Sequence, residues 1–407
     1  MKLDVVVYGA TGFTGRLVCE HLVKSYGAGS VRWAMAGRNR DKLESLRSEL
    51  CQQYSADASS IDILVGDAFD KPSLDAIASK TKVLLSTAGP FAISGAPVVD
   101  ACVANHTHYV DITGEVPFIA AMAKKHHDTC KKHNTRVIHC CGYDSVPSDL
   151  GAMAVVRKAR EMGKTICKVT TIVGDSRGGV SGGTIASGMN LAADRDLAKS
   201  DMGMYSFIPP NETKGTDADI WSPRYCEATQ GWLAPFVMAV VNTRVVQRSN
   251  YLLDWGKEKF SYAEHMGVGS RFKAWTVSAA TAMIGFIISQ PWMHPLVKKM
   301  VPKQGEGPSR DTMMNGYYNH MVIGECTDGT VIRGRFSDKT RDPGYWGTSR
   351  LLLEAALCLA LDMDALNACD EVLKGGVLTP ASGLGVVYAE RLHKAGIECD
   401  TDASATI

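Results

Sequence analysis

Three observations predict an α/β protein built on a Rossmann-type, doubly wound parallel sheet. The short apolar run 3–8 is followed by glycines at 9, 12 and 15 and then by a helical stretch, and short apolar segments alternate with helices to residue 141. Gly9 permits a tight turn, Gly12 lets backbone approach a pyrophosphate, and Gly15 lets the helix pack closely on the strand. The free N–H groups at the helix start would face the phosphates. A glycine-rich turn without a ligand is the alternative.

The next elements alternate as a parallel sheet requires. We expect strands at residues 31–36, 61–65, 83–86, 108–112 and 136–140, and helices at 13–26, 41–54, 96–105 and 117–133. Short apolar strands separated by helices imply a sheet that is covered on both faces. Ligands bind beyond the carboxyl ends of such strands, where Asp67 and the stretch 87–90 fall.

The pattern changes after residue 147. A strand at 166–174, a glycine-rich loop at 177–184 with a helix to about 199, and a hairpin at 317–325 and 331–336 follow. An apolar helix at 346–361 and a helix ending at 394 come last. We therefore expect a dinucleotide-binding domain at 1–146, an inserted α/β substrate domain at 147–344, and a C-terminal segment at 345–407 that returns to the first domain.

Arginines follow the second predicted strand, where an NAD site would place an acidic residue for the ribose 2′-hydroxyl. The residues there are Gly37, Arg38, Asn39 and Arg40. A guanidinium suits a 2′-phosphate, which favours NADP(H) over NAD. The alternative is a solvated arginine pair that caps the next helix.

Charge and cysteine content limit the class of protein. The net charge is +1 with 21% charged residues, so we expect no nucleic-acid partner. The twelve cysteines form no Cys-x-x-Cys pair, and the first strand begins at residue 3. We expect reduced, packed thiols in an intracellular protein without a signal peptide.

One long segment, residues 274–297, contains no Asp, Glu, Lys or Arg. Arg271 and Lys273 precede it, and Trp275 and Trp292 lie near its ends. It could span a bilayer, lie in a lipid interface, form a buried helix, or cover a substrate pocket; the cationic flanks and tryptophans favour an interface. We expect an intracellular protein on membranes or lipid droplets, with the mitochondrion and the cytosol as alternatives.

A metal site is a weaker hypothesis. His126, Cys130 and His133 lie on one face of a predicted helix, within a lysine-rich stretch. Structural zinc usually requires a fourth ligand, so we interpret this segment as a solvated basic face and expect no metal.

Eight motifs in order make the chain resemble the saccharopine dehydrogenase-like oxidoreductases, over nearly its whole length. The motifs occupy residues 9–15, 36–38, 87–91, 109–115, 142–149, 181–184, 305–309 and 375–380. The resemblance extends to eukaryotic members of unassigned substrate and to bacterial trans-acting enoyl reductases of glycolipid synthesis. It implies a nicotinamide-dependent reductase with a Rossmann domain and an inserted α/β substrate domain.

We expect the cofactor to be held at the glycine turn, at the arginines and at the strand ends. The residues are Gly9, Thr11, Gly12, Phe13, Thr14, Gly15, Gly37, Arg38, Arg40, Asp67, Thr87, Ala88, Gly89 and Pro90.

Candidate proton donors follow the late strands. Asp111, Glu115, Tyr143, Asp144 and Ser145 gather near one predicted strand edge. We expect Tyr143 and Asp144, with Asp111, to serve catalysis by supplying a proton to the reduced atom. Alternatively the two aspartates cap turns, and 145–149 begins a helix.

These features predict an NADP(H)-dependent oxidoreductase that reduces a bulky, lipid-like substrate, as enoyl reductases do. The alternatives are a cofactor-binding protein without turnover on lipid droplets or membranes, and a saccharopine or amino-acid dehydrogenase. Short-chain dehydrogenases are excluded because no tyrosine has a lysine four residues later. The reduced bond and the oligomeric state, a homodimer among the options, stay open.

Overall fold

The computed structural model describes residues 2–178, 202–294 and 307–402. Its chain divides into two compact units: unit 1 comprises Met1–Tyr143, Gly305–Gly307 and Gly344–Arg391, and unit 2 comprises Asp144–Gln304, Pro308–Pro343 and Leu392–Ile407. The expected helix reaching residue 199, the motif at 181–184, the first two residues of the motif at 305–309 and the end of the uncharged segment lie outside the described residues.

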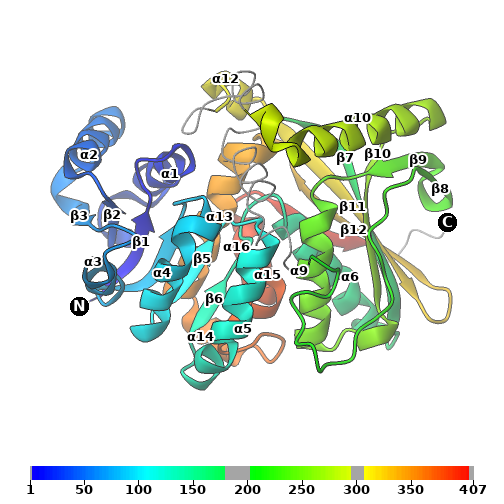
Figure 1. The fold of residues 1–407 in the computed structure, drawn as a ribbon. Coiled ribbons are helices and arrows are strands. Elements are labelled where there is room, and N and C mark those ends of the chain that lie inside the picture. The colour runs from blue at the N-terminus through cyan, green and yellow to red at the C-terminus, as the bar shows by residue number, and fades with distance from the viewer. Residues whose placement is uncertain (1, 179–201, 295–306, 403–407) are drawn as a thin grey trace. The chain divides into compact units, whose positions relative to one another are not determined.

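Unit 1 is built on a seven-stranded parallel sheet, which confirms the predicted fold class (Figure 1). The strands, in spatial order, are β13 (Gly376–Leu378), β6 (Arg136–Ile138), β5 (His108–Asp111), β4 (Thr81–Ser86), β1 (Leu3–Tyr8), β2 (Trp33–Gly37) and β3 (Asp62–Val65). All neighbours are parallel. The chain builds outward from β1 to β3 and then returns to β4 on the other side of β1. The boundary between β1 and β4 is therefore the topological switch point, where such sheets bind ligands.

Helices cover both faces of this sheet. α1 (Phe13–Ser30), α2 (Arg40–Tyr54) and α13 (Thr348–Leu361) lie on one face, and α3 (Lys71–Ala78), α4 (Phe91–Ala104) and α5 (Val116–Lys132) lie on the other. The remaining helices of this part are η1 (Ala58–Ser60), α14 (Met363–Ala368), α15 (Pro380–Gly383) and α16 (Gly385–Lys394). Because both faces are covered, Val5, Val6 and Val7 are all fully buried, and β1 is a continuous apolar run.

Several boundaries differ from the expected ones, and two of these differences have a clear physical reason. β6 ends at Ile138 because Cys140 has a φ of +62° and the Cys141 N–H donates back to the Asp111 carbonyl, at 2.8 Å. α4 begins at Phe91 rather than at residue 96, because a carboxylate caps the earlier turn, as described below.

Unit 2 contains a mixed seven-stranded sheet. Its order is β14 (Glu398–Asp402), β12 (Val331–Asp338), β11 (Tyr317–Cys326), β7 (Ile166–Arg177), β10 (Ser261–Gly267), β9 (Gly231–Pro235) and β8 (Arg224–Cys226). Only β7 and β10 pair in parallel. α6 (Val146–Glu161) and α9 (Ala239–Leu253) pack on this sheet. The expected β11–β12 hairpin is present, with Gly329 at a φ of +85° in its turn.

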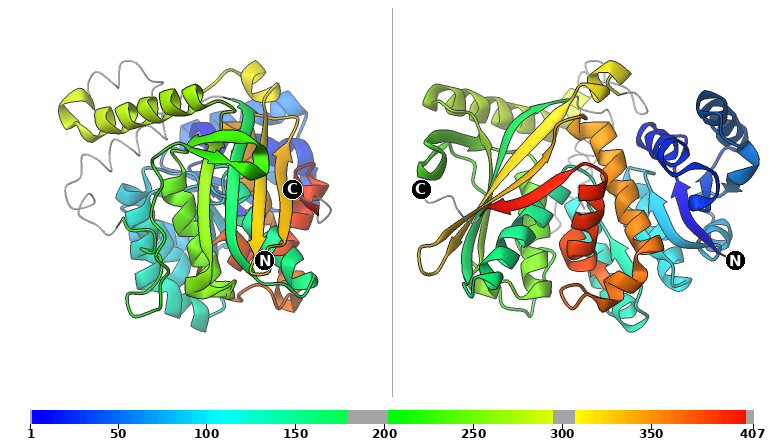
Figure 2. Two further views of the ribbon diagram at one scale, coloured as in Figure 1. Left: turned by 90° about the vertical axis from the view of Figure 1, so that its right-hand side faces the viewer. Right: turned by 180° about the vertical axis from the view of Figure 1, so that it is seen from behind.

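α10 (Arg271–Ser289) runs along the outside of unit 2 (Figure 2). Ala274 is its only buried residue, and Phe272 is 78% and Phe286 62% exposed. It is the one helix in the described part of the chain that is long and apolar enough to cross a membrane. Of the alternatives for this segment, a buried helix does not fit residues 271–289, because Ala274 alone is buried there. The remaining helices here are η2 (Glu227–Thr229), η3 (Lys257–Lys259), η4 (Pro291–Met293) and α12 (Arg310–Met314), with a π-turn η5 (Pro343–Gly347) between the units.

Candidate functional site

The glycine turn after β1 is a closely packed backbone structure. Gly9 has a φ of +87°, which favours glycine, and a Cβ on Gly15 would overlap the Gly9 carbonyl oxygen. The Thr87 hydroxyl, which follows β4, donates to that same oxygen at 3.1 Å. Two of the three glycines are thus required by the protein's own packing.

Gly12 is less crowded than Gly9 and Gly15 by the residues that the structure describes. A Cβ there would meet only the Gly9 oxygen, at 3.2 Å. Gly12 is the N-cap of α1, which has no side-chain cap and no acidic residue in its first turn. Thr11 and Gly12 are exposed, and Phe13 and Thr14 are half-buried. An uncapped helix N-terminus at the switch point, with an exposed glycine as its N-cap, fits a pyrophosphate.

The two arginines after β2 have different environments. Arg40 forms an exposed ion pair with Glu44, at 3.5 Å. Arg38 is exposed and makes no ion pair with any described residue. The helix cap is supplied by Asn39, which accepts from the Lys42 N–H at 2.9 Å. The helix-capping alternative therefore does not account for Arg38, whose guanidinium is free to bind a 2′-phosphate.

The other predicted cofactor residues lie at the carboxyl ends of β2, β3 and β4. Asp67 is half-buried after β3, and its carboxylate accepts from the Phe69 N–H at 2.9 Å. Burial and, to a smaller extent, the charge of Asp67 raise the pKa of Tyr8, at the end of β1, to about 12, against the opposing charge of Arg38. Both charges therefore act on the end of β1. Gly37, Thr87, Ala88, Gly89 and Pro90 complete this edge.

Glu115 closes the helix start that follows β4. Its carboxylate accepts from the N–H groups of Phe91 at 3.1 Å and Ala92 at 2.6 Å. The α4 N-terminus is thereby capped by a buried anion, whereas that of α1 is not. The start of α4 is therefore closed to an anionic ligand, whereas the start of α1 is open to one.

Asp111 has a structural environment. It is completely buried; Oδ2 lies 2.8 Å from His139 Nδ1, and Oδ1 accepts from the Thr113 and Cys140 N–H groups at 3.1 and 3.4 Å. The turn-capping interpretation fits this geometry, because the carboxylate joins the ends of β5 and β6. We assign Asp111 as a positioning residue.

Tyr143 and Asp144 lie where the chain leaves unit 1. Tyr143 is buried, and its N–H donates to the Thr348 hydroxyl at 3.2 Å. The Asp144 side chain is reached by solvent, yet desolvation by surrounding protein raises its pKa to about 6. α6 begins directly afterwards, as the helix-start interpretation expects.

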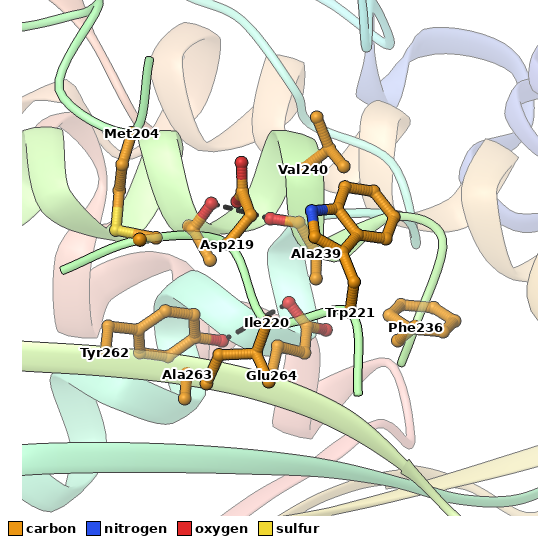
Figure 3. Close-up of a pocket in the computed structure, with 12 residues that line it drawn as sticks. Met204, Asp219, Ile220, Trp221, Phe236, Ala239, Val240, Tyr262, Ala263 and Glu264 are labelled. Carbon is orange, nitrogen blue, oxygen red and sulfur yellow. Dashed lines mark hydrogen bonds between the residues drawn. The ribbon is translucent and has the colours of Figure 1, made fainter. Parts of the chain in front are cut away.

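Sequence reasoning missed a buried network in unit 2. Glu264 Oε1 accepts from the Ser148 hydroxyl at 2.9 Å and from Asn242 Nδ2 at 3.1 Å. Asn242 Oδ1 in turn accepts from the Ser145 hydroxyl at 2.8 Å. The sequence does show an acidic residue at an inward position of β10. No pattern near it in the sequence indicates its hydrogen-bond partners on α6 and α9. Glu264 also lies in the wall of a small pocket of unit 2, where the Tyr262 hydroxyl is 3.5 Å from its Oε2 (Figure 3).

The proposed metal face is not a solvated surface. His126 and Cys130 are buried in unit 1, and His126 Nε2 lies 2.6 Å from Asp100. The basic face therefore consists only of the lysines and His133, because His126 and Cys130 turn inward. No group of three His, Cys, Asp or Glu side chains in the described ranges could hold a metal. None of the twelve cysteines forms a disulfide, and eight of them are buried.

Comparisons with known proteins agree with this geometry. The family model of the saccharopine dehydrogenase NADP-binding domain matches residues 5–138. A Mycobacterium tuberculosis protein, assigned by name only as a trans-acting enoyl reductase, is 37% identical over 425 aligned positions, which cover 100% of this chain and 99% of its own. The chain belongs to the saccharopine dehydrogenase-like oxidoreductases. A trans-acting enoyl reductase of Mycobacterium leprae is 32% identical, with 98% of each chain covered.

A solved member of the same fold supports the architecture of both units. The apo saccharopine dehydrogenase of Saccharomyces cerevisiae aligns with a TM-score of 0.54 at 11% identity, covering 98% of this chain and 99% of its own. This saccharopine dehydrogenase-like protein is an NADP-dependent oxidoreductase, and its matched domain contains the glycine turn, Arg38 and the stretch 87–90.

Proposed function

We propose that this oxidoreductase reduces the carbon–carbon double bond of a lipid-like α,β-unsaturated carbonyl compound with NADPH. The observation that carries the proposal is the 37% identity to a relative named as a trans-acting enoyl reductase, which extends through unit 2 and not only through the NADP-binding region. The yeast saccharopine dehydrogenase shares only the fold at 11% identity, so it gives no comparable support to an amino-acid substrate.

The residues of unit 1 fit NADPH. The uncapped α1 N-terminus would hold the pyrophosphate and Arg38 the 2′-phosphate, while Asp67 and the stretch 87–90 would line the adenosine and nicotinamide sides. When bound, NADPH supplies the hydride that a carbon β to the carbonyl receives.

The protein must then deliver a proton to the α carbon. Tyr143 and Asp144 are the proposed donors. Asp144 is solvent-accessible and has a pKa of about 6, so near neutral pH it exchanges protons readily with water. Asp111 positions these two residues, because its carboxylate accepts a hydrogen bond from the Cys140 N–H in the turn that precedes them.

NADPH oxidation by the full chain tests this function, with trans-2-dodecenoyl coenzyme A as substrate and dodecanoyl coenzyme A as the matched control. We expect oxidation with the unsaturated thioester only. NADPH binding without oxidation by enoyl thioesters of any chain length would favour the cofactor-binding protein without turnover. NADP⁺ reduction by saccharopine would favour the amino-acid dehydrogenase instead.

We also propose that α10 lies in the interface of an intracellular membrane or lipid droplet. Its exposed side chains are large and apolar, and Trp275 and Phe286 are 56% and 62% exposed. Arg271 and Lys273 at its start suit anionic headgroups. In the competing arrangements, α10 spans the bilayer or is covered by a second copy of the chain.

Flotation with phosphatidylcholine–phosphatidylserine vesicles tests this docking. We expect the protein to float with the vesicles and a triple serine variant at Phe286, Ile287 and Ile288 to stay in the dense fraction. Leu361→Ser, at an exposed apolar residue outside α10, is the matched control and should float normally. A soluble dimer that does not float would contradict the proposal, and so would resistance to alkaline extraction, which indicates a spanning helix.

A further inference from the structure

The exposed apolar side chains of unit 1 gather at one edge of its sheet. Among the described residues of this unit, four large apolar side chains are exposed. Val65 is the last residue of β3, Phe69 lies in the loop after it, and Ile93 lies in the first turn of α4, which follows β4. Only Leu361, at the end of α13, lies elsewhere. Phe69 is the most exposed of the four, at 71%. Exposed apolar surface that is confined to a ligand-binding edge indicates contact with a ligand or a partner.

The loop that carries Phe69 is a direct neighbour of Arg38. β2 and β3 lie side by side in the sheet, and Gly37 of β2 pairs with Val65 of β3 (Figure 1). Beyond that pair, the Gly66 N–H donates to the Gly37 carbonyl at 3.1 Å. Arg38 follows Gly37 directly, and neighbouring strands are only about 4.8 Å apart. A ligand that binds at Arg38 therefore lies beside the loop after β3.

This loop, residues 66–70, is held by its own hydrogen bonds. The Asp67 carboxylate accepts from the Phe69 N–H at 2.9 Å, and the Asp67 N–H donates to the Ser73 hydroxyl at 3.1 Å. That hydroxyl donates to the Asp70 carbonyl at 2.8 Å. The backbone of Phe69 is thus fixed before any ligand binds, which lowers the entropic cost of using its ring as a binding surface.

The position of Arg38 determines which part of NADPH reaches this loop. The 2′-phosphate belongs to the adenosine half of the cofactor, and the uncapped start of α1 suits the pyrophosphate that links the two halves. With the 2′-phosphate at Arg38, the adenine base is one ribose away, on the β2–β3 side of the sheet. The nicotinamide belongs on the opposite side of the pyrophosphate, toward β4 and β5. The base that comes to this loop is flat and has two apolar faces, which suit an exposed aromatic ring.

We propose that the ring of Phe69 is the stacking surface for the adenine base of NADPH. The inference rests on the binding of the 2′-phosphate at Arg38, and it holds whichever substrate the protein reduces. The carboxylate of Asp67, next to the ring, is an acceptor for the amino group on the edge of the base. So few apolar side chains, beside the charges of Arg38 and Asp67, suit a single base better than a protein surface, which needs hundreds of square ångströms.

Binding of adenosine 2′,5′-bisphosphate to the full chain tests the assignment, because this molecule carries the base and the 2′-phosphate but no nicotinamide. Loss of base–aromatic stacking in Phe69→Ala should raise Kd about five- to a hundredfold in a calorimetric titration. Phe69→Trp keeps an aromatic face and should bind about as tightly as the wild type. Phe272→Ala, at a comparably exposed phenylalanine of unit 2, is the matched control and should not change Kd.

The two dinucleotides give a second readout that does not depend on turnover. Adenine is common to NADPH and NADH, so Phe69→Ala should weaken the binding of both by the same factor in fluorescence titrations. Arg38→Ala differs, because it removes a contact to a phosphate that NADH lacks. Since Phe69 is exposed, its replacement should leave the midpoint of urea unfolding unchanged, so that the loss of affinity is not a loss of folding.

Three results would overturn the proposal. The first is unchanged affinity of Phe69→Ala for adenosine 2′,5′-bisphosphate, and the second is an equal loss in Phe69→Ala and Phe69→Trp. The third is a Phe69→Ala variant that changes only the oligomeric state in sedimentation velocity, because Phe69 would then belong to an interface between copies of the chain.

The outcomes also distinguish this assignment from the proposed reaction. If adenosine 2′,5′-bisphosphate binds with the expected pattern but no enoyl thioester is reduced, the assignment of Phe69 is supported and the enoyl-reductase function fails. If enoyl thioesters are reduced but Phe69→Ala binds the bisphosphate as the wild type does, the function is supported and the assignment fails. A wild-type protein that does not bind the bisphosphate would overturn the placement of the 2′-phosphate and of the base together.

Discussion

The two units differ in how their candidate polar sites are built. In unit 1 the site is formed by backbone: the glycine turn and the uncapped N-terminus of α1, all within residues 9–15. In unit 2 they are side chains that come together from α6, α9 and β10, as Ser148, Asn242 and Glu264 do. The backbone site is formed by one contiguous stretch of sequence. The side-chain site combines residues from distant positions, with Ser148 and Glu264 116 residues apart.

The largest expected effect concerns the two residues at the boundary of the units. Tyr143→Phe or Asp144→Asn should lower kcat at least a hundredfold, since proton donation typically contributes about 10²–10⁴-fold. Stopped-flow measurement of NADPH oxidation checks this, with NADPH affinity as the control that should not change. Full activity in both variants would show that neither side chain supplies the proton, and water or another group would take that role.

Arg38→Ala should lower the affinity for NADPH much more than the affinity for NADH. Loss of a charge-assisted contact to the 2′-phosphate costs roughly 1.5–3 kcal/mol, or about ten- to a hundredfold in NADPH affinity. NADH affinity should hardly change. Arg40→Ala is the matched control, because Arg40 already pairs with Glu44, and fluorescence titration gives both affinities. An equal loss for both cofactors would make Arg38 a structural residue.

Two alanine substitutions distinguish the structural role of Gly15 from the proposed cofactor-binding role of Gly12. Gly15→Ala should lower stability by roughly 1–3 kcal/mol, because its Cβ overlaps the Gly9 oxygen. Gly12→Ala should change stability much less, since its Cβ meets that oxygen at 3.2 Å and φ is −74°, but should weaken NADPH and NADH alike. Urea unfolding and cofactor titration check both. Normal cofactor binding by Gly12→Ala would remove the pyrophosphate assignment.

The smallest expected effect belongs to unit 2. The pKa of Glu264 is raised from 4.5 to about 7, so the folded state holds more protons between these values. Its stability contribution is therefore present at acidic pH and is lost as pH rises through this window. Glu264→Gln should remove that loss and stabilise the protein by roughly 1–3 kcal/mol at pH 8. Urea unfolding of both proteins at pH 5 and pH 8 gives the difference, and a parallel decline in the variant would contradict the assignment.

Sequence alone predicted the parts that depend on local patterns. Strand–glycine–helix spacing located the switch point, and the missing acid after β2 indicated NADP. Asp111 shows the limit, because its pattern suited either catalysis or a turn, and only the contact with His139, 28 positions later, favours the turn. The hydrogen-bond partners of Glu264 could not be predicted, because Ser148 and Asn242 are 116 and 22 positions away from it.

The uncharged segment shows a different limit. The sequence shows that residues 274–297 contain no Asp, Glu, Lys or Arg. Whether such a segment is buried depends on whether the unit offers a complementary surface. Among the described residues, α10 packs against β9, with Ala274 buried and Arg271 over the Trp232 ring at 5.6 Å, but most of its side chains are exposed. Tertiary packing, which a hydropathy pattern does not contain, decides between a core helix and an exposed one.

The position of β13 has a consequence for biosynthesis. Val377 pairs with Val137, so the edge strand of the parallel sheet is made 240 residues after its neighbour. At about 5–20 residues per second, a ribosome needs roughly 12–48 s to supply it. During that time the β6 edge and the sheet face that α13 covers have no partner from their own unit, while the whole of α6 to β12 is being synthesised. The nascent chain therefore presents an open strand edge until β13 is made, and the N-terminal 143 residues alone are not an independently closed domain.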